Sequence, residues 1–195
     1  MDGMSYIQSY LKASMLVKQD LINNTEVLSQ IDKAANLIIE AYRNNNKVLL
    51  AGNGGSAADA QHIAAEFVSR FFYDRPGLPA LSLTTDSSML TAIGNDYGFV
   101  NLFSRQVQAQ GSEGDIFIGI STSGNSENIL NAIKAAREHG LYSIVFCGKG
   151  GIIKSEADIA ICVPSDCTPH IQECHIVVGH IICAIVEKTI FPSDK

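Results

Sequence analysis

The chain has 195 residues, of which 46% are hydrophobic and 17% charged, a composition typical of one globular domain and not of a disordered or fibrous protein. Its 14 Lys and Arg residues against 20 Asp and Glu residues give a formal charge of −6, which argues against a direct nucleic-acid partner. The five cysteines lack a CxxC spacing and the first ten residues do not resemble a signal peptide, so we expect reduced thiols and a cytoplasmic protein.

The first 45 residues are predicted to form two helices. In the segment 27–42 apolar side chains recur at intervals of three and four residues, as they do on one face of a helix. These positions are Leu28, Ile31, Ala35, Ile38, Ile39 and Tyr42.

Five short apolar segments follow, separated by stretches with helical patterns. The segments cover residues 47–51, 80–84, 115–121, 143–147 and 158–163. Most are apolar throughout and do not alternate with polar residues, as is typical of strands buried on both faces. Strands that alternate with helices indicate a parallel sheet covered by helices on both sides, which is an α/β fold.

The loop after the first of these segments, in LLAGNGGSAAD (49–59), is rich in glycine. Glycine lets a ligand approach the backbone closely because it has no Cβ. Gly52, Gly54 and Ala57 fit the dinucleotide-binding fingerprint, but the match is weak because the acidic residue expected about twenty positions later is missing. Ser56 is predicted to be the N-cap of the helix that follows.

A second loop follows the segment 115–121 and contains four hydroxyl side chains. They belong to Ser121, Thr122, Ser123 and Ser126, directly before a predicted helix that stops at Gly140. One hydroxyl would be enough to cap that helix, whereas several hydroxyls and the positive end of the helix dipole can bind a phosphate. The pattern favours phosphate binding, and without a GK[ST] motif it does not match a nucleotide P-loop.

Three residues after the glycine-rich loop are spaced four apart. His62, Glu66 and Arg70 would share one side of a helix. Such a ladder is usually a solvent-exposed surface feature, but its position on the helix that follows the glycine-rich loop favours a functional site. His62 and Glu66 would also suit two ligands of one metal ion.

His180 lies in an apolar helix predicted over about residues 169–188. Its neighbours one turn away are apolar or weakly polar, so its imidazole needs a partner elsewhere in the fold or in another chain. A single histidine of this kind is more often a satisfied core residue than a catalyst. The helix is apolar around much of its circumference, which predicts burial against another subunit. Its longest apolar run, residues 175–186, is too short to cross a membrane.

Four segments together resemble the phosphoheptose isomerase family, within the wider group of sugar isomerase (SIS) domains. They are AGNGGSAADAQH, TAIGNDYGF, GISTSGNS and HIQECHIVVGH. The resemblance covers nearly the whole chain and implies a three-layer αβα sandwich with a flavodoxin-like sheet of five parallel strands. It also implies a single SIS domain over residues 1–195 and a homotetramer with active sites between subunits, in which N-terminal helices of about residues 1–45 pack. The implied reaction converts sedoheptulose 7-phosphate into D-glycero-D-manno-heptose 7-phosphate, for bacterial lipopolysaccharide, capsule or another glycan.

The resemblance further implies roles for individual residues. Glu66 would be the base and His180 the acid, with one Zn²⁺ per subunit polarising the substrate oxygens. The implied zinc ligands are His62, Glu66, Gln172 and His180. The implied phosphate ligands are Ser121, Thr122, Ser123 and Ser126. The other implied substrate contacts are Asn53, Gly54, Gly55, Ser56, Glu66, Asn95, Asp96 and Gln172.

The chain departs from the family pattern at Pro169, where some members have an acid, so a sugar contact at that position is not expected. Gln172 and His180 are about 12 Å apart along an ideal helix. For both to bind one metal ion, Gln172 must reach back from the first turn, or a second subunit must contribute.

Two other classes of protein share parts of this pattern. Replication-initiator-associating proteins resemble the family and keep its fold and tetramer, but they act by binding a protein. They lack a carboxylate at the Glu66 position and a histidine at the His180 position, and this chain has both. A phosphosugar-sensing regulatory domain would be expected to carry a DNA-binding segment, of which the sequence gives no sign.

Overall fold

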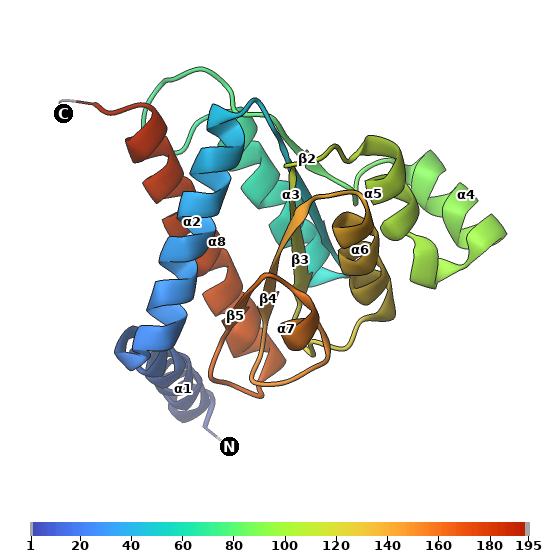
Figure 1. Ribbon diagram of the computed structural model, residues 1–195. Coiled ribbons are helices and arrows are strands. Elements are labelled where there is room, and N and C mark those ends of the chain that lie inside the picture. The colour runs from blue at the N-terminus through green and yellow to red at the C-terminus, as the bar shows by residue number, and fades with distance from the viewer. Residues whose placement is uncertain (1, 194–195) are drawn as a thin grey trace.

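Two long helices open the chain in the computed structural model, which describes residues 2–193. α1 spans Gly3–Asn23 and α2 spans Thr25–Arg43, as predicted for the first 45 residues. Asn24 separates them, because its extended backbone ends the first helix while its side chain accepts a hydrogen bond from Val27 N (3.1 Å) and caps the second. α2 packs on the body of the molecule, whereas α1 extends from it with most of its surface exposed (Figure 1).

Within residues 2–193 five strands form one parallel sheet in the order β2-β1-β3-β4-β5. They are Val48–Gly52 (β1), Ala80–Ser82 (β2), Ile116–Ser121 (β3), Tyr142–Cys147 (β4) and Ile159–Cys162 (β5). Every residue of β1 and β3 is buried, which explains why these segments are apolar up to Ser121 at the end of β3. The strand order is that of a flavodoxin-like sheet, so the predicted fold is confirmed.

Helices cover both faces of this sheet and make the three predicted layers (Figure 1). The first face carries α2, α3 (Gly55–Val68) and α8 (Thr168–Ile190). The second carries α5 (Ser104–Gln110), α6 (Glu127–Glu138) and α7 (Ile153–Glu156). α4 (Ser87–Tyr97) and the 3₁₀ helix η1 (Phe99–Asn101) project beyond α5 and α6, and none of the eleven residues of α4 is buried.

The predicted apolar face of α2 is confirmed with one correction. Five of its six positions are buried, but Leu28 is 44% exposed and Val27 takes its place in the core. The helix begins at Thr25, so Val27 is already helical. Val27 lies one turn before Ile31 on the side that faces the sheet, whereas Leu28 is turned away from it.

Several helices keep large apolar side chains on their outer surfaces. The exposed ones on α1 are Met4, Ile7, Leu11, Met15, Leu16 and Ile22. On α8, Val177 and Ile181 are 37% and 40% exposed. Within residues 2–193, no helix combines the length and the apolar character needed to span a bilayer.

Strand order places the two predicted loops next to each other. β1 and β3 are neighbours, with Gly52 directly opposite Ile120, so the loops that follow them leave the sheet at the same carboxyl edge. The chain reaches β2 on one side of β1 and β3 on the other, which makes this the switch point where ligands bind in open α/β sheets.

Candidate active site

The glycine-rich loop turns sharply into α3. A Cβ at Gly52 would collide with the backbone of Ser56, and Gly54 has a φ of +56°, in the left-handed region that favours glycine. The helix therefore begins at Gly55 with Gly54 as its N-cap, and within residues 2–193 no side chain caps it. The prediction that Ser56 is the N-cap is wrong, because Ser56 lies inside the first turn of the helix, where it is buried.

Asn53 ties the glycine-rich loop to the serine-rich loop. Its amide nitrogen donates to Asn128 Oδ1 (3.0 Å), and the amide nitrogen of Asn128 donates to Asn53 Oδ1 (2.9 Å). Asn128 belongs to the first turn of α6 and is 2% exposed. This reciprocal pair fixes the spacing between the two loops, and no sequence pattern had indicated a role for Asn128.

Three of the four hydroxyls of the serine-rich loop lie close together, and their predicted phosphate role stays a prediction. Ser121 Oγ lies 2.9 Å from Ser126 Oγ and 3.5 Å from Ser123 Oγ. Ser126 is the N-cap residue of α6, yet its side chain bonds to none of the helix N–H groups in the described part of the chain. Those N–H groups and the positive end of the helix dipole thus remain available to an anion.

The loop after β4 supports the serine-rich loop from behind. Gly148 N donates to Thr122 O (3.1 Å), and Gly124, with a φ of +67°, packs directly on the backbone of Gly150 and Gly151. A side chain at Gly124 would collide with that backbone. The conformation that brings the hydroxyls together therefore depends on two loops in contact.

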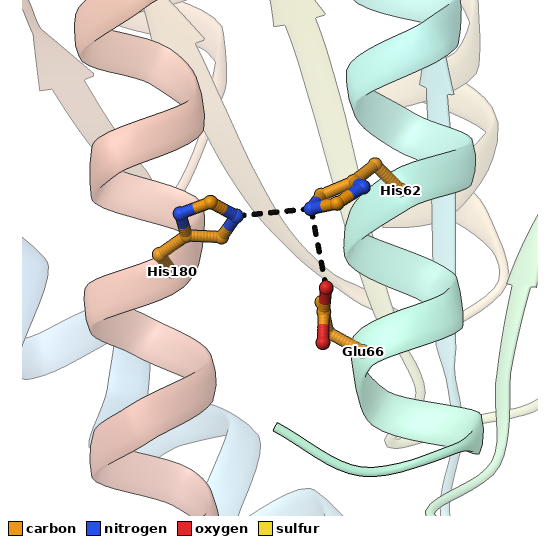
Figure 2. Close-up of side chains that lie close together, drawn as sticks. All are labelled: His62, Glu66 and His180. Carbon is orange, nitrogen blue, oxygen red and sulfur yellow. Dashed lines mark hydrogen bonds and ion pairs between the residues drawn. The ribbon is translucent and has the colours of Figure 1, made fainter. Parts of the chain in front are cut away.

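His62, Glu66 and His180 form a second group of convergent side chains, here called the His–Glu–His cluster (Figure 2). His62 Nε2 lies 3.0 Å from His180 Nε2 and 3.2 Å from Glu66 Oε1. His180 is half-buried and comes from α8, whereas the other two come from α3. The partner that His180 requires is thus found within the same chain.

The geometry of this cluster fits a metal ion. The three ligand atoms all lie within 4.8 Å of one another, and two imidazoles with one carboxylate are a ligand set that zinc sites use. A tetrahedral zinc ion with bonds of about 2.0–2.1 Å separates neighbouring ligand atoms by about 3.3–3.4 Å. The separations of 3.0 and 3.2 Å around His62 Nε2 are close to that value.

Gln172, the fourth predicted zinc ligand, lies at a different place. Its side-chain amide packs against Gly55, where any Cβ would collide with it. His62 and Glu66 are seven and eleven residues after Gly55, about 10 and 16 Å farther along the helix axis. Gln172 is thus next to the glycine-rich loop, and its role as a zinc ligand stays a prediction.

One detail of the predicted ladder is corrected. His62 and Glu66 lie in the third and fourth turns of α3. Arg70 does not share their helix side, because α3 ends at Val68 and Arg70 follows it on the exposed surface.

Asn95 and Asp96 are both exposed near the end of α4. Asn95 donates to the carboxylate of Asp96 (2.7 Å). Figure 1 shows α4 projecting away from α3 and α8, which carry the cluster. Their predicted contact with the sugar stays a prediction.

A buried ion pair next to the cluster was not predicted. The side chains of Arg75 and Glu187 are 2% and 1% exposed, with Arg75 Nε 3.1 Å from Glu187 Oε1. Arg75 also donates to Glu66 O (2.8 Å), so the pair holds the end of α3 against α8. Burial raises the pKa of Glu187, but hydrogen bonds from Phe72 N, Phe71 N and Arg75 outweigh it and lower that pKa.

Asp59 adds a carboxyl group on the same helix, one turn before His62. Burial raises its pKa, while the charges of His62 and His180 act in the opposite direction. Its Oδ2 is buried without a hydrogen-bond partner among the described residues. The sequence suggested only a helix-capping role for Asp59, three residues after Ser56, and no role in the site.

Comparisons with known proteins agree on one family. The family model described as SIS domain matches residues 10–148. A phosphoheptose isomerase of Aneurinibacillus thermoaerophilus is 59% identical over 187 residues, covering 95% of this chain and 94% of that protein. Phosphoheptose isomerase 2 of Campylobacter jejuni is 58% identical over 188 residues, covering 96% and 94%.

Solved structures give the same result. A phosphoheptose isomerase from Francisella tularensis superimposes with a TM-score of 0.91 at 38% identity, covering 96% of this chain and 100% of that one. One from Neisseria gonorrhoeae gives a TM-score of 0.89 at 41% identity, covering 95% and 98%.

Proposed function

The chain belongs to the SIS domain family, and on that basis we propose that it converts sedoheptulose 7-phosphate into D-glycero-D-manno-heptose 7-phosphate. It is an aldose–ketose isomerase. The observation that carries this function is the convergence of Glu66 with two histidines in a chain whose relatives are named phosphoheptose isomerases. The alternative of a protein that only binds the replication initiator is not favoured. Replication-initiator-associating proteins lack a carboxylate at the Glu66 position and a histidine at the His180 position.

The serine-rich loop binds the phosphate of the substrate in this proposal. The hydroxyls of Ser121, Ser123 and Ser126 converge at the N-terminus of α6, and Thr122 lies between them in sequence. Hydroxyl and backbone N–H donors at a helix N-terminus suit a dianion. The glycine-rich loop and Gln172 lie beside it and contact the sugar.

The reaction moves a carbonyl group from C2 to C1 of the sugar. One proton must pass between these carbons, and another between the oxygens they carry. Glu66 accepts the carbon-bound proton and returns it to the neighbouring carbon, and His180 exchanges the proton of the oxygens. Arg75 holds the backbone of Glu66 through the carbonyl oxygen, so the base is fixed at the end of a supported helix.

We propose that His62, Glu66 and His180 also hold one Zn²⁺ per subunit, with Gln172 as the fourth predicted ligand. When bound, zinc supplies a Lewis acid that polarises the oxygens of the substrate. The fit of the three ligand atoms to a tetrahedral site supports this assignment.

The active enzyme is proposed to be a homotetramer in the cytoplasm. The exposed apolar side chains of α1, together with Val177 and Ile181 on α8, support burial against other subunits. α4 has no buried residue of its own and carries Asn95 and Asp96, and in this proposal it reaches the site of a neighbouring subunit. The product serves the synthesis of bacterial surface heptose in lipopolysaccharide, capsule or another glycan.

The direct test is an assay of the purified protein with sedoheptulose 7-phosphate, following the heptose 7-phosphate by anion-exchange chromatography and NMR. Formation of the aldose at a rate that depends on Glu66 supports the proposal. A folded protein that holds metal and forms no aldose would contradict it.

A further inference from the structure

Two cysteines lie side by side at the carboxyl ends of β4 and β5. Cys147 and Cys162 are directly opposite in the parallel register, so their side chains share one face of the sheet. Their Sγ atoms are 3.5 Å apart, and both thiols are free. This face is covered by α5, α6 and α7, opposite the face that carries the His–Glu–His cluster. The proposed isomerase mechanism uses neither cysteine.

The two thiols differ in accessibility. Cys147 is fully buried, whereas Cys162 is partly exposed and lines a cavity of about 390 Å³ between the start of α2 and the edge strand β5. Lys154 and Glu26 line the same cavity. A small molecule in that cavity meets Cys162, whereas Cys147 does not line the cavity.

The two thiols also differ in acidity. The hydrogen bond with Cys147 lowers the pKa of the Cys162 thiol to about 7, and the charge of Lys154 acts in the same direction. The same hydrogen bond, together with burial, raises the pKa of Cys147. Cys162, the accessible thiol of the pair, is thus also the one that more readily becomes the thiolate, which is the nucleophilic form.

We propose that Cys147 and Cys162 are a peroxide-sensitive dithiol that closes to a reversible intramolecular disulfide. The Cys162 thiolate attacks one peroxide oxygen, so that an S–O bond forms, the O–O bond breaks, and the leaving hydroxide takes up a proton to become water. Cys147 then attacks the sulfenic sulfur, so that an S–S bond forms, the S–O bond breaks, and the Cys147 proton leaves with that oxygen as a second water. Two thiols are oxidised and one peroxide is reduced to two waters.

The backbone permits this closure. Neighbouring strands are about 4.8 Å apart, and disulfides join residues whose Cα atoms are roughly 4.4–6.8 Å apart. The sulfur atoms must approach from 3.5 Å to about 2.05 Å, which changes the side-chain torsions of both cysteines and the packing at the ends of β4 and β5.

The serine-rich loop lies on the other side of β4, so the disulfide acts on it. Cys147 is directly opposite Ser121 in the β3–β4 register, and the next residue, Gly148, donates from its N–H to Thr122 O. A Cβ at Gly148 would lie 2.8 Å from Thr122 O, so the backbones of the two loops are in close contact at this point. Oxidation therefore weakens anion binding at the loop, a consequence that rests on the phosphate role proposed above.

The test of the disulfide uses the full chain, reduced and then treated with hydrogen peroxide. Remaining thiols are alkylated under denaturing conditions, and the digest is examined by mass spectrometry. Two of the five thiols are expected to escape alkylation, with the peptides of Cys147 and Cys162 linked and released by dithiothreitol. Cys162→Ser abolishes the link, whereas Cys167→Ser, which removes an exposed thiol outside the pair, keeps it. Unlinked Cys147 and Cys162 peptides after peroxide treatment of the unmodified chain would overturn the proposal.

The consequence for the loop is measured with inorganic phosphate. The rise in melting temperature on adding phosphate should be smaller for the oxidised protein than for the reduced protein. An equal rise in both would overturn the coupling to the loop. No rise in either would overturn the phosphate role of the loop together with the coupling, and the linked peptides would still decide whether the disulfide forms.

Discussion

Two groups of charged or titratable side chains join the same two parts of the molecule, and they differ in how fully their polar atoms are satisfied. The Arg75–Glu187 pair links the end of α3 to α8 with side chains 2% and 1% exposed. Both oxygens of Glu187 also accept backbone N–H groups, from Phe71 and Phe72. The His–Glu–His cluster lies nearby on the same helices, yet the side chains of His62 and Glu66 are 48% and 22% exposed.

The difference separates a structural role from a chemical one. A buried pair whose hydrogen bonds are all made has no capacity left for a ligand, and removing one partner leaves an uncompensated charge. The cluster instead directs three side chains at one point and leaves them accessible (Figure 2). We therefore expect changes in the pair to lower stability and changes in the cluster to lower activity.

The largest effect is expected from His180→Gln. The loss of the acid should lower kcat by about 10²–10⁴-fold, while the melting temperature changes little because the side chain is only half-buried. His139→Gln, an exposed histidine at the end of α6, is the matched control and should keep its kcat. A His180 variant with full activity would remove the cluster from the mechanism.

Glu187→Gln should instead lower the melting temperature and leave kcat nearly unchanged. Breaking a buried pair costs about 3–5 kcal/mol, or roughly 6–20 °C in melting temperature for a domain of this size. The kcat of the molecules that remain folded should stay close to wild type. Glu156→Gln, which breaks an exposed pair with Arg137, should cost less than about 1 kcal/mol. Equal losses in the two variants would show that burial of the pair has no special role.

The serine-rich loop can be weakened without touching either group. Ser121→Ala with Ser126→Ala should raise KM strongly, because each hydrogen bond lost to a dianion costs about 1.5–3 kcal/mol, or roughly 10- to 150-fold in affinity. Ser155→Ala, on the exposed surface of α7, is the control. An unchanged KM in the double variant would contradict the phosphate role of the loop.

The smallest expected effect is a loss of folding stability at low pH, caused by protonation of the buried carboxylates. Glu187 has a lowered pKa, and so has Asp115, where hydrogen bonds from Lys47, Ser112 and Asn46 outweigh the effect of burial. A carboxyl group with a lowered folded pKa stabilises the protein fully above its unfolded value of about 4, and this contribution disappears as the pH falls through the folded pKa.

Urea unfolding at stepwise lower pH should therefore show stability falling below about pH 4–5, by at most about 1.4 kcal/mol per pH unit for each group. The Glu187→Gln variant should show a shallower dependence, because one of the titrating groups is gone. An identical pH dependence in that variant would contradict the assignment.

Sequence patterns were sufficient for the sheet and for the two loops. A strand buried on both faces is mostly apolar, so segments such as 115–121 can be recognised without tertiary information. The serine-rich loop was predictable for a similar reason, since several hydroxyls before a helix are more than a cap requires. The resemblance to a known family then predicted that Glu66 and His180 belong to one site, and in the structure they lie in one cluster.

What failed depends on backbone conformation and on long-range contact. Ser56 has the right side chain for an N-cap, but the left-handed backbone of Gly54 starts the helix two residues too early for it. Arg70 has the right spacing, but the helix ends before it. Arg75 and Glu187 are separated by 112 residues, and neither lies in a motif, so only the folded chain reveals their pairing.

The measurement that tests the central claim most directly is solvent proton exchange in Glu66→Gln, with the substrate in deuterated water. The variant keeps the shape of the side chain but cannot accept the proton. If the cluster performs the chemistry, exchange at the reacting carbons and isomerisation should both fall by about 10²–10⁴-fold, while the melting temperature stays close to wild type. Metal content is measured beside them, because Glu66 is also a proposed zinc ligand. Exchange and kcat near wild-type values in a folded, metal-containing variant would contradict the claim and leave Glu66 as a surface residue.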